Sequence, residues 1–333
     1  MSRKPAKTQH ASTKKPKRSN ALTAARPASS MSVKLRRGEP ADAKECGRIV
    51  FEAFKSIATK HDFPQDFTSP EVGAMLMSFL LGHAKFYSVV AELDGRIVGS
   101  NFMDERSEIA GVGPISVDPI IQGKGFGRIL MEDVLARAKE RKFPGVRLAQ
   151  AAYNNQALCL YTKLGFRTRE PLSIMRGSPP KVKLVGYDVR AGRQDDIESC
   201  NLLCHRIHGH ARAGEVEDAV RDKTATVVER NGRITGYATS IGFFAHAVSE
   251  TNEDMMALIA AASEISGLGI LVPTRNHRLF YMVLGKQPAT CTPNDAYEHR
   301  PLQPTDRRLS TISALLSGVF AALHMSADGT QQR

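Results

Sequence analysis

The stretch from residue 113 to residue 130 brings together groups that could bind an anion. It reads Gly-Pro-Ile-Ser-Val-Asp-Pro-Ile-Ile-Gln-Gly-Lys-Gly-Phe-Gly-Arg-Ile-Leu, and a helical pattern follows it. The first turn of a helix leaves backbone N–H groups without partners at the positive end of the helix dipole. Glycines just before that turn let a bulky phosphate approach the backbone, and Lys124 and Arg128 add positive charge. We therefore predict a pyrophosphate-binding site between a strand and a helix.

A glycine-rich turn is a weak indication by itself, and a turn without any ligand is the open alternative. The order Gly-x-Gly-x-Gly is neither the Gly-x-Gly-x-x-Gly of dinucleotide-binding folds nor a phosphate loop ending in Gly-Lys-Ser or Gly-Lys-Thr. Two further features change the interpretation. The loop opens with Gln122, and a later segment from Asn154 reads Asn-Asn-Gln-Ala-Leu-Cys-Leu-Tyr-Thr-Lys-Leu-Gly-Phe.

Together these two segments resemble the GCN5-related N-acetyltransferase (GNAT) superfamily. In that family the acyl-CoA loop reads Arg/Gln-x-x-Gly-x-Gly/Ala, and a later helix reads Asn-x-x-Ala-x-x-Leu-Tyr-x-x-Leu-Gly-Phe. The resemblance covers roughly Val33 to Gly177. It implies an α/β fold with a mixed, splayed sheet flanked by helices, and it implies acetyl-CoA as the cosubstrate.

The resemblance also implies roles for individual residues. In the family the fourth strand splays from its neighbour and holds the pantetheine arm, and a backbone N–H, here that of Val117, polarises the thioester carbonyl. Tyr161 occupies the position of a general acid to the CoA sulfur, or it only packs its ring. Asn154 binds the pantetheine or merely caps its helix. The expected cofactor-binding residues are Ile115, Ser116, Val117, Gln122, Gly123, Lys124, Gly125, Phe126, Gly127, Arg128 and Asn154.

A general base is harder to assign. Glu105 and Glu108 lie before the fourth strand, where such enzymes often place a carboxylate that draws the proton from the amine, and either could equally be a solvated turn residue. The expected reaction is direct transfer of an acetyl group from acetyl-CoA to the primary amine of an unidentified acceptor. A non-catalytic acyl-CoA-binding sensor or scaffold is the alternative.

Local patterns predict the elements that must position these residues. Apolar spacing indicates helices, alternation indicates strands, and Asp94-Gly95 is typical of a tight hairpin turn. The expected strands are Val33 to Arg36, Phe86 to Glu92, Arg96 to Met103, Ile109 to Val117, Gly145 to Ala151 and a strand from Phe166. The expected helices are Glu39 to Phe54, Pro70 to His83, Arg128 to Lys142 and Asn154 to Leu164.

Two short sequence patterns of the first half recur later in the chain. Leu35 to Cys46 matches Val189 to Cys200 at one constant offset, and Glu92 to Gly99 matches Glu229 to Gly236. Two echoes in the same order predict tandem copies of the fold. The second copy lacks the glycine loop, because residues 249 to 254 read Ser-Glu-Thr-Asn-Glu-Asp, whose three carboxylates would repel phosphate. We therefore expect a degenerate second domain that shapes the acceptor pocket, forms a dimer surface or stabilises the first domain.

These expectations give a domain layout. Residues 33-178 form the catalytic domain, 179-183 a linker, 184-290 the degenerate domain, and 291-333 a C-terminal extension with one apolar helix from Leu309 to Met325. Residues 1-32 contain eight Lys or Arg and no Asp or Glu, which predicts a disordered basic tail. A solvated tail or an over-long start upstream of Met31 is the simplest interpretation. A nucleic-acid arm and a transit peptide are the alternatives.

Composition bounds the remaining function classes. With 42% hydrophobic and 24% charged residues the chain reads as a soluble protein, and no apolar run is long enough to predict a membrane span. The net charge of +12 belongs mostly to the tail, so nucleic-acid binding is not expected of the folded part. Five cysteines show no disulfide framework, which favours a cytoplasmic location. Cys200 and Cys204 lack zinc spacing, so no metal is expected, and a homodimer stays open.

Overall fold

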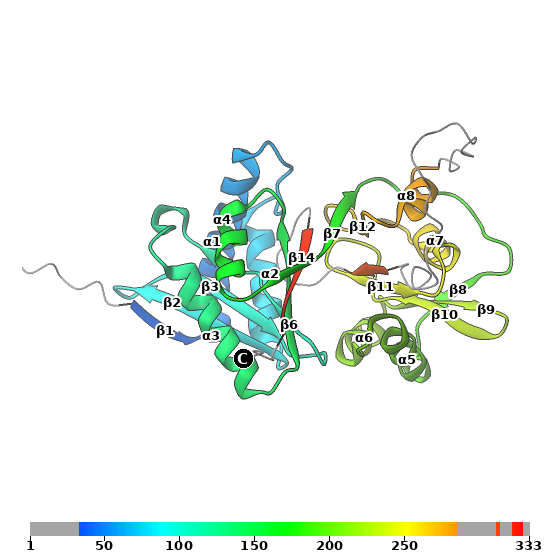
Figure 1. Cartoon of the computed structure of the whole chain (residues 1–333), viewed down its shortest axis with the longest axis horizontal. Helices are drawn as coiled ribbons and strands as arrows, with labels where there is room; N and C mark the ends of the chain where they lie inside the picture. The colour runs from blue at the N-terminus through cyan, green and yellow to red at the C-terminus, as the bar shows by residue number, and fades with distance from the viewer. Residues whose placement is uncertain (1–32, 286–310, 314–321, 329–333) are drawn as a thin grey trace, which may run out of the picture. The chain divides into compact units, whose positions relative to one another are not determined.

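The computed structural model describes residues 33–285, 311–313 and 322–328, arranged as two β-sheets with flanking helices (Figure 1). The expectations for the basic tail fall outside these residues. The first sheet begins with three antiparallel strands, β1 (Val33–Arg37), β2 (Phe86–Leu93) and β3 (Arg96–Asp104). Asp94 and Gly95 between β2 and β3 have positive φ angles of 50° and 78°, which confirms the predicted hairpin turn.

The strand expected from Ile109 to Val117 is wrong as a single element. The structure divides it into β4 (Ala110–Val112) and β5 (Ser116–Val117), with a cis peptide bond between Gly113 and Pro114. Pro114 has no N–H to donate to a sheet ladder, so a continuous strand is not available here. β4 pairs in parallel with β6 (Gly145–Ala151), whereas among the described strands β5 pairs with β3 alone.

Helices cover both faces of this sheet. One face carries α1 (Ala43–Lys60) and α2 (Pro70–Gly82), whose apolar side chains share a core with Val90 of β2. The other face carries α3 (Phe126–Glu140) and α4 (Asn155–Lys163), which share a second core with the adjacent residue Val89. Successive residues of a strand point to opposite faces, so β2 is buried on both sides. The predicted mixed sheet flanked by helices is confirmed, and the helices lie within a few residues of their expected positions.

The second half repeats the element order of the first. Two helices again separate the first strand from a hairpin, and a helix again follows the next strand. The elements are β8 (Asp188–Ala191), α5 (Ile197–His208), α6 (Ala213–Arg221), β9 (Thr226–Arg230), β10 (Arg233–Ala238), β11 (His246–Ser249), α7 (Asn252–Ala261), β12 (Ile270–Pro273) and α8 (His277–Val283).

One ion-pair network occurs in both halves, at the positions of the sequence echo. In the first half the Arg36 guanidinium donates to both oxygens of Asp42, at 2.7 and 2.8 Å, and to Glu92 at 2.7 Å. In the second half Arg190 bonds Asp196 at 2.7 and 2.9 Å and also bonds Glu229. The same three groups therefore fasten the first strand to the following helix and hairpin in each half.

The apolar helix expected from Leu309 to Met325 is wrong in the described residues. β13 (Thr311–Ser313) pairs with β11, and β14 (Ala322–Asp328) lies between β6 and β7 (Arg167–Met175). The sheet order is β1-β2-β3-β4-β6-β14-β7-β12, so the C-terminal strand completes the sheet of the first half and β12 extends it. Backbone pairing with two strands outweighs the local helical pattern, because buried N–H and C=O groups require partners.

Charged side chains from both halves meet at a buried junction. Ser107 of the first half donates to Glu215 of α6 at 2.9 Å, and Arg212 donates to the same carboxylate at 2.7 Å. Arg147 of β6 is buried and donates to Nε2 of His210 at 2.6 Å, so this imidazole is an acceptor and must be neutral. Truncating one partner of such a buried set leaves an uncompensated charge, so the junction fixes how the halves meet.

Two histidines at this junction, the half-buried His210 and the buried His246, predict acid sensitivity. Burial lowers the pKa of His210 and of His246 to about 4, from an ordinary value of 6.5. Between pH 6.5 and 4 these two histidines are therefore protonated in the unfolded chain but neutral in the folded chain. The free energy of unfolding should fall as the pH falls. Burial opposes ionisation of Glu215, but the adjacent Arg212 guanidinium outweighs it and holds the pKa of this carboxyl well below its ordinary value, so its contribution is lost at still lower pH. Urea unfolding followed by circular dichroism at pH 7 and pH 5 measures this difference.

His210→Asn should make the difference between the two pH values smaller. His205→Asn, an exposed histidine of α5, is the matched control and should leave it unchanged. Equal pH dependence in the wild type and both variants would contradict the assignment of a neutral imidazole.

Candidate active site

The loop before α3 has the backbone geometry expected of an anion site. Gly123 and Gly125 have φ angles of 80° and 92°, in the region that favours glycine, and open space lies where a Cβ atom would be. Within the part of the chain that the structure describes, no hydrogen bond satisfies the backbone N–H groups of residues 123 to 127. Five successive donors at a helix N-terminus can surround a phosphate.

The side chains of the loop have different roles. Gln122 Nε2 donates to the carbonyl oxygen of Val117 at 3.0 Å, which ties the loop to the end of β5. Phe126 is buried in the core, so it anchors α3 and can offer a ligand only its backbone N–H. Lys124 and Arg128 are exposed, and Arg128 bonds Glu132 at 2.9 Å. An exposed pair of this kind is weak, so the guanidinium can turn to a bound anion.

β5 presents backbone groups away from its partner strand. Asp118 N donates to the carbonyl oxygen of Val98 at 2.9 Å, so the N–H of Asp118 faces β3. Because N–H groups alternate in direction along an antiparallel strand, the N–H of Val117 faces the opposite edge. Ile115 lies two residues earlier and shares that direction, whereas Ser116 faces β3. On the far side β6 pairs with β4 and β14 and not with β5, so Val117 borders the place where the sheet splays.

α4 places a buried phenol in the same core as Val117. Tyr161 is 6% exposed and packs against Phe166 with ring centroids 5.9 Å apart. Burial raises the pKa of its hydroxyl above the ordinary value, so the phenol is protonated at neutral pH. Asn154 Oδ1 accepts from the N–H of Ala157 at 3.1 Å, so its side chain caps α4.

The two glutamates suggested as a base have structural partners. Glu105 accepts from Arg137 at 2.8 Å and lies 3.7 Å from Arg141. Glu108 accepts from the backbone N–H of Ala211 at 3.1 Å. Both oxygens of Glu105 are thus paired with arginine, whereas Glu108 is exposed and bonded through one oxygen. Their catalytic role stays a prediction.

The sequence did not predict a set of buried polar groups near the C-terminal end of β6. Asp66, Gln150 and Tyr153 carry buried side-chain oxygen or nitrogen atoms without a hydrogen-bond partner among the described residues. Asp66 lies in the connection between α1 and α2, far from β6 in the sequence. No motif marks it, so only the fold could bring these residues together.

The corresponding helix start in the second half is already occupied. Thr251 Oγ1 accepts from the N–H of Asp254 at 3.1 Å, and the Asp254 carboxylate accepts from the N–H of Thr251 at 3.1 Å. This capping box satisfies donors that a phosphate would need. Glu250 adds a carboxylate bonded to Arg233 at 2.6 Å. The expected absence of a phosphate cradle in this half thus has a structural cause.

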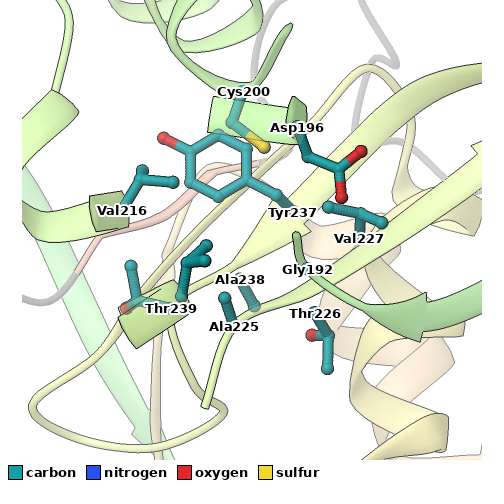
Figure 2. A pocket seen from close by; sticks show the side chains of 11 residues that line it. Gly192, Asp196, Cys200, Val216, Ala225, Thr226, Val227, Tyr237, Ala238 and Thr239 are labelled. Carbon is teal, nitrogen blue, oxygen red and sulfur yellow. The ribbon is translucent and has the colours of Figure 1, made fainter. Parts of the chain in front are cut away.

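A pocket between α5, α6 and the second sheet is a packing gap (Figure 2). It has no room for a water molecule. Cys200, Val216 and Tyr237 contribute side chains to its lining, as Figure 2 shows. It is therefore not a ligand site. Within the described ranges no helix is long and apolar enough to cross a membrane, and no cluster of His, Cys, Asp and Glu could hold a metal ion.

Comparison with known proteins decides the family of the first half. Residues 53–166 match the acetyltransferase (GNAT) family. The chain carries a GNAT acetyltransferase domain. The GNAT domain contains the loop, β5 and α4 described above, so the resemblance that the sequence predicted is confirmed.

Relatives of known name match this domain over short stretches. The mycothiol acetyltransferase of Thermomonospora curvata is 39% identical over 92 residues, 27% of this chain and 31% of that protein. That of Nocardia farcinica is 41% identical over 63 residues, 19% of this chain and 21% of that protein. The chain thus matches less than a third of the length of these two relatives.

A solved structure resembles both halves together. An acetyltransferase candidate from Pyrococcus horikoshii aligns with a TM-score of 0.59 over 90% of each chain, at 14% identity. At this identity the likeness concerns the fold alone. It extends beyond the GNAT match into the second half.

Close packing between β3 and β5 predicts that Gly99 tolerates no side chain. A Cβ atom there would lie 2.7 Å from the carbonyl oxygen of Ser116 and 3.1 Å from Leu130. Gly99→Ala should therefore cost about 1–3 kcal/mol in the free energy of unfolding, because backbone must move. Gly82→Ala is the matched control, since no heavy atom lies within 4 Å of the new Cβ. Equal urea midpoints for the two variants would contradict the close approach of β5 to β3.

If the loop before α3 binds phosphate, reversing the charges of Lys124 and Arg128 should weaken acetyl-CoA binding. Lys124→Glu combined with Arg128→Glu should weaken acetyl-CoA binding roughly 100-fold in calorimetric titration, because two attractive contacts with phosphate become repulsive. Lys34→Glu combined with Lys139→Glu changes the net charge equally at exposed positions elsewhere and should leave the affinity within about threefold. Similar losses in both double variants would show that net charge, and not this loop, governs binding.

Proposed function

We propose that the protein is an N-acetyltransferase that moves an acetyl group from acetyl-CoA to a primary amine. The proposal rests on the splayed edge of β5 inside a GNAT domain. Val117 N–H points to the gap between β5 and β6, and the unsatisfied N–H groups of residues 123–127 follow in the next loop. A strand edge can hold the pantetheine arm by backbone hydrogen bonds, and a helix N-terminus can hold the pyrophosphate.

The proposed transfer is direct. The amine nitrogen attacks the thioester carbonyl carbon, whose oxygen gains negative charge and accepts from Val117 N–H. The C–S bond then breaks, and the departing sulfur takes the hydroxyl proton of Tyr161. Burial favours the protonated phenol, as this role requires.

The second half has a supporting role in this proposal. Its repeated element order and ion-pair network support a degenerate GNAT-like copy over residues 184-290, and its capped α7 argues against a second CoA site. It also supplies Phe243 and Leu271 to a cluster with Ala149 and Ala151 of β6. We therefore infer that it closes one side of the acceptor pocket.

The acceptor of the named relatives is not carried over to this chain. Those relatives are named for acetylation of a mycothiol acceptor, and the shared stretch covers too little of them to carry that acceptor over. A primary amine is the acceptor class that direct transfer in this family requires.

Tyr161 gives a direct test of the chemical step. Tyr161→Phe should lower kcat about 100-fold or more, since general acid catalysis typically contributes that much, while acetyl-CoA affinity stays unchanged. Stopped assays of CoA release and calorimetric titration measure the two quantities. Tyr281→Phe, at a partly exposed position in α8, is the control and should match the wild type. Full turnover of Tyr161→Phe would remove this residue from the mechanism.

A further inference from the structure

Asp66 is a buried carboxyl without a visible structural role. It lies in the connection between α1 and α2, and both of its side-chain oxygens are buried without a hydrogen-bond partner among the described residues. Burial raises its pKa to about 9. A buried polar group that lacks a partner destabilises the fold, so one that is retained indicates a ligand or a catalytic task.

Aromatic rings cluster at Tyr153, which lies near this carboxyl. The Tyr153 ring lies 4.3 Å from that of Phe63 and 5.0 Å from that of His61, measured between centroids. Phe54 and Phe67 meet edge to face at 5.6 Å. The Tyr153 hydroxyl is also buried without a partner, and burial, followed by the nearby Asp66 carboxyl, raises its pKa. With its raised pKa the Asp66 carboxyl is protonated at neutral pH while the site is empty. An organic ammonium ion bound among these aromatic faces favours the carboxylate, because the opposite charge lowers the pKa again.

The position of Tyr153 connects this cluster to the proposed reaction. Tyr153 lies two residues beyond the end of β6 and directly precedes Asn154, which caps the helix carrying Tyr161. Within β6, Val146 and Leu148 face the core of α3 and α4, whereas Ala149 and Ala151 pack with Tyr153 and Phe54. The aromatic cluster therefore lies on the face of β6 opposite the core that contains Tyr161. An acceptor held there would reach the gap between β5 and β6 from the side away from the CoA helix.

We propose that Asp66 and Tyr153 bind the ammonium group of an acceptor whose carbon frame is aromatic or apolar, and that Asp66 is the general base. This inference rests on the proposed function. The ammonium gives one proton to Asp66, and the free nitrogen attacks the thioester carbon. The C–S bond breaks, the sulfur takes the proton of Tyr161, and the second nitrogen proton restores that phenol. Asp66 then releases its proton to water, so acetylated amine, CoA and one proton leave.

The test uses the full chain with 2-phenylethylamine as the aromatic probe and ethylamine as the probe without a ring. The wild type should acetylate 2-phenylethylamine with a kcat/KM at least about tenfold above that for ethylamine, since burying a ring adds binding energy. Asp66→Asn should lower kcat/KM for 2-phenylethylamine about 100-fold or more, with the affinity for acetyl-CoA unchanged. Asp62→Asn, an exposed carboxylate in the same connection, is the matched control and should stay within about twofold.

A stability measurement separates this role from a structural one. If Asp66 serves a ligand, Asp66→Asn should unfold at the same or a higher urea concentration, because an uncompensated buried carboxyl is removed. A lower urea midpoint together with an unchanged kcat/KM would overturn the proposal. The proposal would also be overturned if the wild type bound acetyl-CoA but did not acetylate 2-phenylethylamine, and its CoA complex did not bind this amine in calorimetric titration. Failure to bind acetyl-CoA at all would instead count against the proposed function.

Discussion

The parting of β5 from β6 is the constraint on which the rest of the structure depends. A sheet normally satisfies both edges of an interior strand, but among the strands that the structure describes β5 has a partner on one side only. Pro114 ends the preceding strand, and Gly99 lets β3 approach closely enough to hold β5 in place. The glycine loop and α3 then follow directly, so unpaired backbone groups from a strand and from a helix start border one region. Such an arrangement can hold an extended, phosphate-bearing molecule without any dedicated charged pocket.

The repeated element order supports our proposal that the second half is a copy of the first that lacks the CoA site. Both halves preserve the arginine–carboxylate network that fastens the first strand, so this network is a feature of the architecture. The helix start differs, since Thr251 and Asp254 satisfy each other where the first half has glycines. The halves are also interdependent, because β14 completes the first sheet and β12 extends it. We expect neither half to fold well without the other.

Much of the first half could be predicted from sequence because its signals are local. The Asp94-Gly95 turn, the glycines before α3 and the apolar spacing of α1 act within a few residues of themselves, and the structure bears them out. The C-terminal strand could not be predicted, because its conformation is set by β6 and β7, far away in the chain. Asp66 was missed for the same reason. Its significance depends on burial beside Tyr153, which no spacing rule encodes, whereas Glu105 and Glu108 fitted a positional rule but have structural partners.

The most direct measurement is the stoichiometry of acetyl-CoA binding to the full chain by isothermal titration calorimetry. We predict one site per chain, because the Thr251–Asp254 capping box occupies the corresponding helix N-terminus in the second half. Two sites would contradict the claim that the capped α7 excludes CoA. No site would contradict the central claim that the splayed edge of β5 and the loop before α3 form an acyl-CoA site.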